Sequence, residues 1–244
     1  QESDSILAKG MVYQNGLPVK EADTAFPMII QLREGSSLGS KDGDEVYTID
    51  YLTLSDKANM GTGSSSRWYP QGDGTAFVLE NLGMIHDLCL DHVSVTGDQN
   101  TAAVCAYNGG TLENLTVAGS IEAKDFAAGI FAASLPMKEE DETLSKLVNH
   151  AKVTADGTAA GIVAQTKDKV LLEDCVNTGV IEAAVAAGIT TAECENLVLM
   201  RCQNYAPIIS SDNESYGITS NLTANLTDCV GVSENVYPIA ADAN

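Results

Sequence analysis

The chain has few basic residues. Of its 244 residues, 13 are Lys or Arg and 34 are Asp or Glu, so its formal net charge at pH 7 is -21. Binding to nucleic acid requires clustered Lys and Arg side chains that neutralise phosphates. We therefore expect no nucleic-acid partner, and the charge favours neutral or cationic partners.

Long apolar runs are also missing. A membrane-spanning helix needs about 18 or more consecutive apolar residues, and no stretch of the chain approaches that length. Gln1 is not followed by the basic and then apolar segment of an export leader. We expect no transmembrane segment, and an export signal that is removed or was never present.

Aromatic residues make up only 5% of the chain, with a single Trp, although 44% of the residues are hydrophobic. With 19% charged residues, the chain is too apolar for a disordered acidic polymer, so we expect it to fold around a core. Leu, Ile, Val, Ala and Cys must supply most of that core. Such side chains suit a narrow interior with little room for rings.

An internal repeat dominates the sequence. The segment Ala-Ala-Gly-Ile occurs at 127–130, 159–162 and 186–189, with a weaker copy, Ser-Tyr-Gly-Ile, at 215–218. Two aliphatic columns recur at intervals of 27 to 32 residues, three residues apart from each other. The first comprises Ile85, Leu112, Leu144, Leu172, Leu199 and Leu226, and the second comprises Leu88, Leu115, Leu147, Cys175, Cys202 and Cys229. A period of this length indicates a solenoid.

The composition of each repeat favours strands over helices. Short apolar runs rich in Val, Ile, Thr and Leu are broken by Gly, Asn and Asp, and no repeat is long and uninterrupted enough for a helix. Three strands per repeat describe a parallel β-helix, in which equivalent strands stack about 4.8 Å apart. We predict an all-β fold with a parallel β-helix of about six coils in residues 71–244.

Residues 1–70 do not share the repeat. Asn15-Gly16 between two apolar stretches predicts a β-hairpin. We expect the whole segment to be a β-rich cap on the first coil, because an uncovered solenoid end invites association. The pair Trp68-Tyr69 either plugs the end of the core or, if it is exposed, stacks on a sugar ring.

The six cysteines include no C-x-x-C pair, so the sequence predicts no zinc site. Cys175, Cys202 and Cys229 occupy the second aliphatic column, and we expect free, buried thiols that act as small hydrophobic residues. Cys105 is expected in the core as well. The positions of Cys89 and Cys194 are left open.

Two polar columns accompany the aliphatic ones. The first lies two residues after the second aliphatic column and comprises Asn149, Asn177 and Asn204. There we expect a left-handed backbone and side-chain amides that hydrogen-bond from coil to coil. The other polar column lies one residue before the second aliphatic column, and its last four members are Lys146, Asp174, Arg201 and Asp228. Their alternating signs predict an outward line of opposite charges.

Candidate functional residues are few. Glu122 and Glu182 form the best pair of acids, two coils and about 9.6 Å apart by strand spacing, with Thr154 between them. Asp42, Asp44 and Glu45 could bind a cation, although their spacing differs from that of an EF-hand loop. His86, His92 and His150 show no metal spacing and no evident nucleophile partner, and we expect surface or turn residues. The acidic insertion at 134–142 predicts an exposed loop that is either only solvated or carries binding.

The segment Cys175-Val176-Asn177-Thr178-Gly179-Val180-Ile181, followed by Ala186-Ala187-Gly188-Ile189, resembles the repeat of GLUG-motif proteins. Gly161-Ile162-Val163-Ala164 is similar to the segment that names the motif, with Ala164 in place of its final Gly. The resemblance covers roughly residues 75–235. It implies a right-handed parallel β-helix in a bacterial secreted or cell-surface protein, with a role in adhesion, surface display or spacing beside a catalytic domain. It transfers no catalytic residue.

Two functions follow as hypotheses. The first is a non-enzymatic, adhesin-like extracellular or cell-surface protein that binds a host, matrix or glycan ligand on a solenoid face or through the 134–142 loop. The alternative, by analogy of fold alone, is a β-helix polysaccharide lyase or glycoside hydrolase. A chain this acidic is poorly suited to the basic cleft that an acidic polysaccharide requires. We assign no catalytic, cofactor-binding or metal-binding residue, and the oligomeric state stays open.

Overall fold

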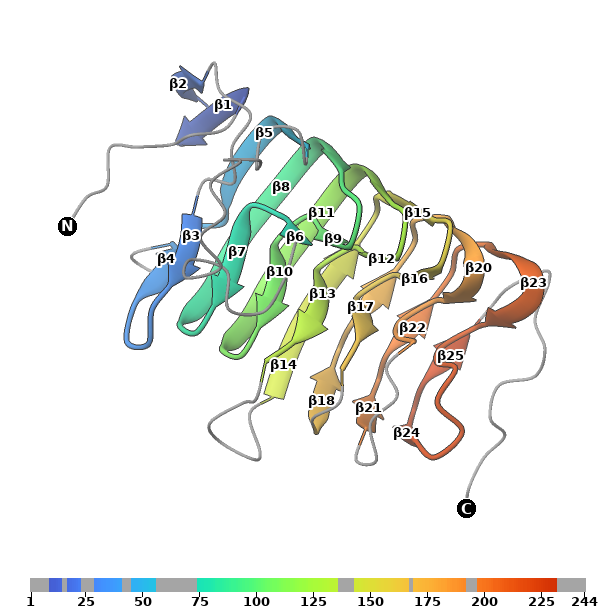
Figure 1. The fold of residues 1–244 in the computed structure, drawn as a ribbon. Coiled ribbons are helices and arrows are strands. Elements are labelled where there is room, and N and C mark those ends of the chain that lie inside the picture. Colours follow the sequence, from blue (N-terminus) through green and yellow to red (C-terminus); the bar gives the residue numbers. More distant parts are fainter. Residues whose placement is uncertain are drawn as a thin grey trace.

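The computed structural model describes residues 9–14, 17–22, 29–40, 45–55, 74–135, 143–166, 169–191 and 197–231. These residues form strands and their connections, and successive coils stack side by side into a solenoid (Figure 1). Strands of neighbouring coils pair in parallel. The predicted all-β parallel β-helix is thus confirmed. In the described part of the chain there is no helix long and apolar enough to cross a membrane.

Most strands belong to one long sheet of 20 strands that folds around the solenoid. Its strands are β1 (Lys9–Gln14), β2 (Leu17–Ala22), β4 (Ser37–Gly39), β5 (Tyr47–Ser55), β6 (Gly74–Thr75), β8 (Met84–Thr96), β9 (Asn100–Ala102), β11 (Thr111–Ala123), β12 (Phe126–Ala128), β14 (Thr143–Asn149), β15 (Lys152–Ala155), β16 (Thr158–Ala160), β18 (Val170–Glu173), β19 (Val176–Asn177), β20 (Ile181–Ala187), β21 (Leu197–Met200), β22 (Gln203–Asn204), β23 (Ile208–Tyr216), β24 (Asn225–Thr227) and β25 (Val230–Gly231). A second sheet comprises β3 (Ile29–Leu32), β7 (Val78–Asn81), β10 (Cys105–Asn108), β13 (Phe131–Ser134) and β17 (Val163–Gln165).

The N-terminal region contributes a hairpin and a coil. β1 and β2 pair antiparallel, with Gln14 opposite Leu17, which confirms the predicted hairpin. β3, β4 and β5 pair in parallel with β7 and β8, so these three strands already stack as a coil on the repeats that follow. The predicted boundary at residue 70 and the pair Trp68-Tyr69 lie outside the described residues.

The core is a stack of aliphatic columns. Leu112 pairs with Ile85, and Leu199 lies between Leu172 and Leu226, so the repeat found in the sequence is the register of the sheet. The first five members of this column are fully buried. Burial of each such side chain contributes about 1.5–3 kcal/mol. Every coil adds the same contribution, and slipping a strand by one residue would turn these side chains toward solvent.

The cysteine column behaves as predicted at its first two positions. Cys175 and Cys202 are buried, free thiols, whereas Cys229 is free but only half-buried near the end of the described solenoid. Cys105 is buried in the core, as expected. Its Sγ lies 4.0 Å from Oδ1 of Asn108.

The asparagine column forms the predicted ladder of amides. Nδ2 of Asn149 donates to Oδ1 of Asn177 at 2.8 Å, and Nδ2 of Asn177 donates to Oδ1 of Asn204 at 2.7 Å. All three side chains are completely buried. Each amide also accepts from the backbone N–H two residues later, so its oxygen and nitrogen are both satisfied inside the solenoid.

The left-handed backbone that we expected at these asparagines lies elsewhere, so that prediction is wrong. It occurs in the charged column one residue before the second aliphatic column, with φ between 50° and 54° at Asp87, Asn114, Lys146, Asp174, Arg201 and Asp228. The chain turns a corner there, just before the next side chain enters the core. The asparagines end strands β14, β19 and β22 instead, and their amides point inward.

The charged column contains fewer direct pairs than its alternating signs suggested. Arg201 Nε donates to Asp174 Oδ1 at 2.7 Å, and the same guanidinium contacts Glu173. Lys146 instead reaches Glu113, with Nζ 3.2 Å from Oε1. These groups are exposed, so each pair contributes little to stability.

Candidate functional site

An open groove of about 610 Å³ follows the solenoid along β12, β16, β20 and β23 and past β17. Figure 1 shows these strands on successive coils. Ten described residues line it: Phe126, Thr158, Ala164, Gln165, Thr166, Val185, Thr191, Glu214, Tyr216 and Ser220. Ala164 belongs to a small cluster of buried alanines, separate from the main core, against which Phe126 packs. These small alanine side chains occupy little volume beside the groove.

One wall of the groove is a column of four side chains in register. Phe126 pairs with Thr158, Thr158 with Val185, and Val185 with Glu214. Each step is one coil, about 4.8 Å. The groove therefore presents an aromatic ring, a hydroxyl, an aliphatic group and a carboxylate at regular intervals to any ligand lying along the axis.

The other wall carries hydrogen-bonding groups. Gln165 Nε2 donates to Asn100 Oδ1 at 2.5 Å, and Asn100 Nδ2 donates to the hydroxyl of Tyr107 at 2.9 Å. The hydroxyl of Thr166 contacts that of Ser134 on the preceding coil. These contacts hold Gln165 and Thr166 in fixed positions, which favours directional hydrogen bonds to a ligand.

The described lining of the groove carries one acidic side chain and no basic one. Glu214 alone carries a charge among the described residues that line it, and it is exposed. A groove without Lys or Arg offers nothing to balance a polyanion. It fits neutral ligands, or ligands with a positive charge near Glu214.

The predicted acid pair lies outside the groove. Glu122 and Glu182 do stand on one column with Thr154 between them, as expected. However, Glu182 is half-buried with Nζ of Lys152 2.6 Å from its Oε2, whereas Glu122 is exposed. Paired glycosidase acids flank one bond of a bound substrate, and neither of these acids lines the groove.

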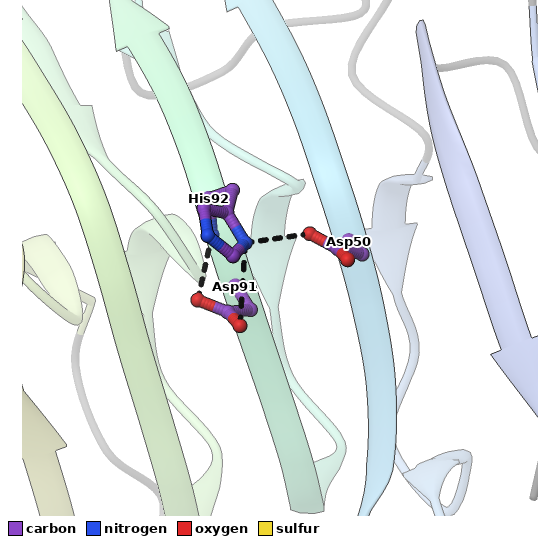
Figure 2. A group of neighbouring side chains, drawn as sticks. All are labelled: Asp50, Asp91 and His92. Atoms are coloured by element: carbon purple, nitrogen blue, oxygen red, sulfur yellow. Dashed lines mark hydrogen bonds and ion pairs between the residues drawn. The ribbon is translucent and has the colours of Figure 1, made fainter. Parts of the chain in front are cut away.

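A cluster of two carboxylates and an imidazole lies at the first coils, where the sequence indicated none. Figure 2 shows Asp50 on β5 facing Asp91 and His92 on β8. His92 Nδ1 lies 2.9 Å from Oδ1 of Asp50 and 3.3 Å from Oδ2 of Asp91, and Tyr51 stacks on the His92 ring. The ligand atoms lie within 4.8 Å of one another, and one nitrogen with two oxygens is a donor set that Zn²⁺ accepts.

The cluster lies where β8 has one residue more than the next coil. Leu90 pairs with Val117 and Val93 with Gly119, so Asp91 and His92 together oppose one residue of the next coil, which is a β-bulge. Asp50 stands directly opposite Asp91, and Nδ1 of His92 contacts both carboxylates. Only the strand register, which brings together residues 41 positions apart, reveals this arrangement.

The other two histidines also have partners that the sequence did not indicate. His150 is exposed and contacts the hydroxyl of Thr178 on the next coil. His86 is half-buried and contacts both Ser37 and Asp87. The predicted surface position is confirmed for His92 and His150.

Several predicted sites fall outside the described residues. These are Asp42 and Asp44, the greater part of the 134–142 loop, and Cys194. Glu45, from the same candidate cation segment, is described and exposed.

Comparison with protein-family models, with curated proteins and with solved structures finds no match to this chain. The function is therefore argued from the groove and the side-chain clusters themselves.

Proposed function

We propose that this chain is an extracellular or cell-surface, adhesin-like protein whose groove binds a neutral glycan without turning it over. The groove along β12, β16, β20 and β23 carries the proposal. Its shape favours an extended ligand, because the same position of the coil contributes one side chain per coil along the axis.

The chemistry of the lining favours a sugar over other extended ligands. Phe126 and Tyr216 offer ring faces, whereas Thr158, Gln165 and Ser220 offer hydroxyl and amide groups. Specific pockets combine apolar surface with a few placed polar groups of this kind. A sugar ring has both an apolar C–H face and hydroxyls that donate and accept, so it matches both features.

The lack of positive charge in the lining sets the ligand class. A polyuronate or a sulfated polymer would bring negative charge to a groove whose charged side chain is Glu214. Like charges brought together in this way oppose binding. A neutral glycan, or one with amino groups, meets no such penalty.

The cellular location rests on other grounds. It follows from the resemblance of the repeat to GLUG-motif proteins, and both the family and the location stay predictions. The high negative charge keeps a repetitive surface soluble and is compatible with display outside the cell.

A pair of threonine variants tests the groove. Thr158 lines it, whereas Thr154 lies in the same coil on the column of Glu122 and Glu182, and both are half-buried. We expect Thr158→Arg to lower binding to a neutral glycan at least about tenfold, a cost of about 1.4 kcal/mol, while Thr154→Arg binds like the unmodified protein. A glycan array identifies the ligand and calorimetry measures its affinity.

Two outcomes would contradict the proposal. One is equal loss of binding in both variants, and the other is a set of array ligands limited to anionic polymers. Depolymerisation of a bound glycan would favour the enzyme alternative. Loss of that depolymerisation in Glu122→Gln or Glu182→Gln would place the reaction on the column of these two acids and not in the groove.

A further inference from the structure

We propose that Ser37 is an activated nucleophile that accepts the acyl group of a small ester, with His86 as its general base and Asp87 as a positioning residue. This activity is separate from glycan binding, because none of the three residues lines the groove.

The three side chains form a continuous chain of hydrogen bonds. Ser37 Oγ lies 2.7 Å from Nε2 of His86, and Nδ1 of the same imidazole lies 2.7 Å from Oδ2 of Asp87. Ser37 comes from β4, and the other two come from β8, which pairs with β4 in parallel. A hydroxyl, an imidazole and a carboxylate in this order activate serine nucleophiles on unrelated folds.

The strand register leaves room for the imidazole over β4. His86 stands opposite Gly39, and Ser37 stands opposite Met84, so the imidazole reaches Ser37 diagonally across the ladder. A Cβ atom on Gly39 would lie 1.8 Å from the carbonyl oxygen of His86 and 3.1 Å from its Cγ. The absence of a side chain at Gly39 is thus a condition for this contact.

A hydrogen bond from Asn114 fixes the orientation of the Asp87 carboxylate. Asn114 Nδ2 donates to Oδ1 of Asp87 at 2.6 Å, which leaves Oδ2 for the imidazole. The hydrogen bonds from His86 and Asn114 lower the pKa of Asp87, so its carboxylate is ionised at neutral pH. An ionised carboxylate keeps the proton on Nδ1 of His86 and leaves Nε2 as an acceptor toward Ser37.

The surroundings of His86 are partly screened from solvent. The side chains of His86 and Asp87 are 16% and 19% exposed, whereas Ser37 is exposed. The other charges that face this pair come from the neighbouring coils. Glu113 stands opposite His86 on β11 and is itself paired with Lys146. The base is therefore sheltered while the nucleophile is open to a substrate.

The reaction follows from these positions. Ser37 Oγ bonds to the acyl carbon as Nε2 of His86 takes its proton, and Asp87 stabilises the resulting imidazolium. The bond from the acyl carbon to the alcohol oxygen then breaks, and His86 returns the proton to the leaving alcohol. Water attacks the acyl-serine in the same way, which releases the carboxylic acid and restores the hydroxyl.

Covalent labelling tests the proposal directly. The full chain is treated with a fluorophosphonate probe, which loses fluoride to a nucleophilic serine, and the modified peptide is identified by mass spectrometry. We expect the label on Ser37. Hydrolysis of p-nitrophenyl acetate is followed in parallel, and Ser37→Ala and His86→Ala are each expected to lower both rates at least about 100-fold.

Ser36→Ala is the matched control, because Ser36 is the adjacent exposed serine and belongs to no such chain. It should react like the unmodified protein. Asp87→Asn should slow labelling and change its pH profile, and circular dichroism verifies that each variant folds.

A label on any other residue, or a Ser37→Ala variant that reacts at the original rate, overturns the proposal. If His86→Ala does not fold, the pH dependence of Ser37 labelling in the unmodified chain replaces that test. The labelling rate must rise with pH as a single group loses its proton, and a rate that does not vary in this way overturns the proposal.

Discussion

The backbone of Gly161 lies against the side chain of Asn177. A Cβ atom added to Gly161 would lie 2.7 Å from Cγ of Asn177 and 2.1 Å from the carbonyl oxygen of Gly188. Gly129 and Gly188 have the same relationship to Asn149 and Asn204. The Ala-Ala-Gly-Ile repeat and the asparagine column, which looked independent in the sequence, are therefore two sides of one contact.

Gly161→Ala should consequently destabilise the solenoid. Overpacking of a filled interior costs about 1–3 kcal/mol or more, and the neighbour here is backbone that cannot move aside. Gly35→Ala is the control, since Gly35 has φ +75° but no atom within 4 Å of an added Cβ. Gly35→Ala should lose less stability, about 1–2 kcal/mol for the left-handed conformation alone. Chemical denaturation measures both, and equal losses would show that the packing is not tight.

Asn177→Ala should be strongly destabilising as well. Asn177 accepts from Asn149, donates to Asn204, and bonds both the N–H and the carbonyl of Gly179. Its removal breaks four buried hydrogen bonds, to Asn149, to Asn204 and to both backbone groups of Gly179, and each lost bond costs about 0.5–1.5 kcal/mol. Asn225→Ala, on an exposed position of β24, should stay within about 0.5 kcal/mol of the unmodified protein. A loss below 1 kcal/mol for Asn177→Ala would argue that the ladder contributes little.

Acidification should weaken the fold through its outward carboxylates. Hydrogen bonds from His86 and Asn114 lower the pKa of Asp87, and the hydrogen bond from Arg201 lowers that of Asp174. A group with a depressed folded pKa stabilises the fold above its unfolded pKa, about 3.9 for Asp, and that stability is lost as the pH falls through the folded value. The melting temperature should therefore decrease as the pH is lowered below about 4.

The contribution of Asp174 can be isolated with Asp174→Asn. The variant should melt at a lower temperature than the unmodified protein at pH 6, and the difference should vanish at a pH below the folded pKa of Asp174. Asn is tolerated in a left-handed conformation, and Asn114 occupies the same column. A difference that persists unchanged into strong acid would rule out the ionised carboxylate as its source.

The buried thiols should react slowly in the native protein. The hydrogen bond with Cys175, followed by burial, raises the pKa of Cys202, and burial raises the pKa of Cys105. The thiolate is the reactive form, so iodoacetamide at pH 7.5 should modify neither residue until denaturant is added. Peptide mapping distinguishes the sites, and the same treatment in denaturant is the control, because the pKa values of the half-buried Cys89 and Cys229 are raised as well. A disulfide in the unreduced protein that joins Cys175, Cys202 or Cys229 to a distant cysteine would contradict the stacked column.

The sequence was informative wherever one residue type repeats. The aliphatic columns, the free cysteines and the amide ladder all follow from spacing, because a parallel solenoid stacks residues one period apart. The left-handed corner was misplaced because Asn tolerates that conformation in general, whereas here a charged or amide side chain in the neighbouring column turns the corner. Propensity identified the residue type but not its place in the coil.

The functional clusters were not predictable in the same way. Ser37 and His86 are 49 residues apart, and Asp50 and His92 are 42 residues apart, with a spacing that matches no repeat. Their approach depends on how β4 and β5 pair with β8 and on the extra residue of β8 between Leu90 and Val93. The groove likewise depends on small side chains of adjacent strands that leave a corner unfilled.

The sequence by itself determined that this chain is an acidic, all-β solenoid with a narrow aliphatic core, because period and composition act locally and recur in every coil. Only the tertiary structure decided which polar side chains meet outside the repeating columns. Contacts between coils that do not repeat depend on register, bulges and the absence of a Cβ at single positions such as Gly39. No periodicity in the chain records these features.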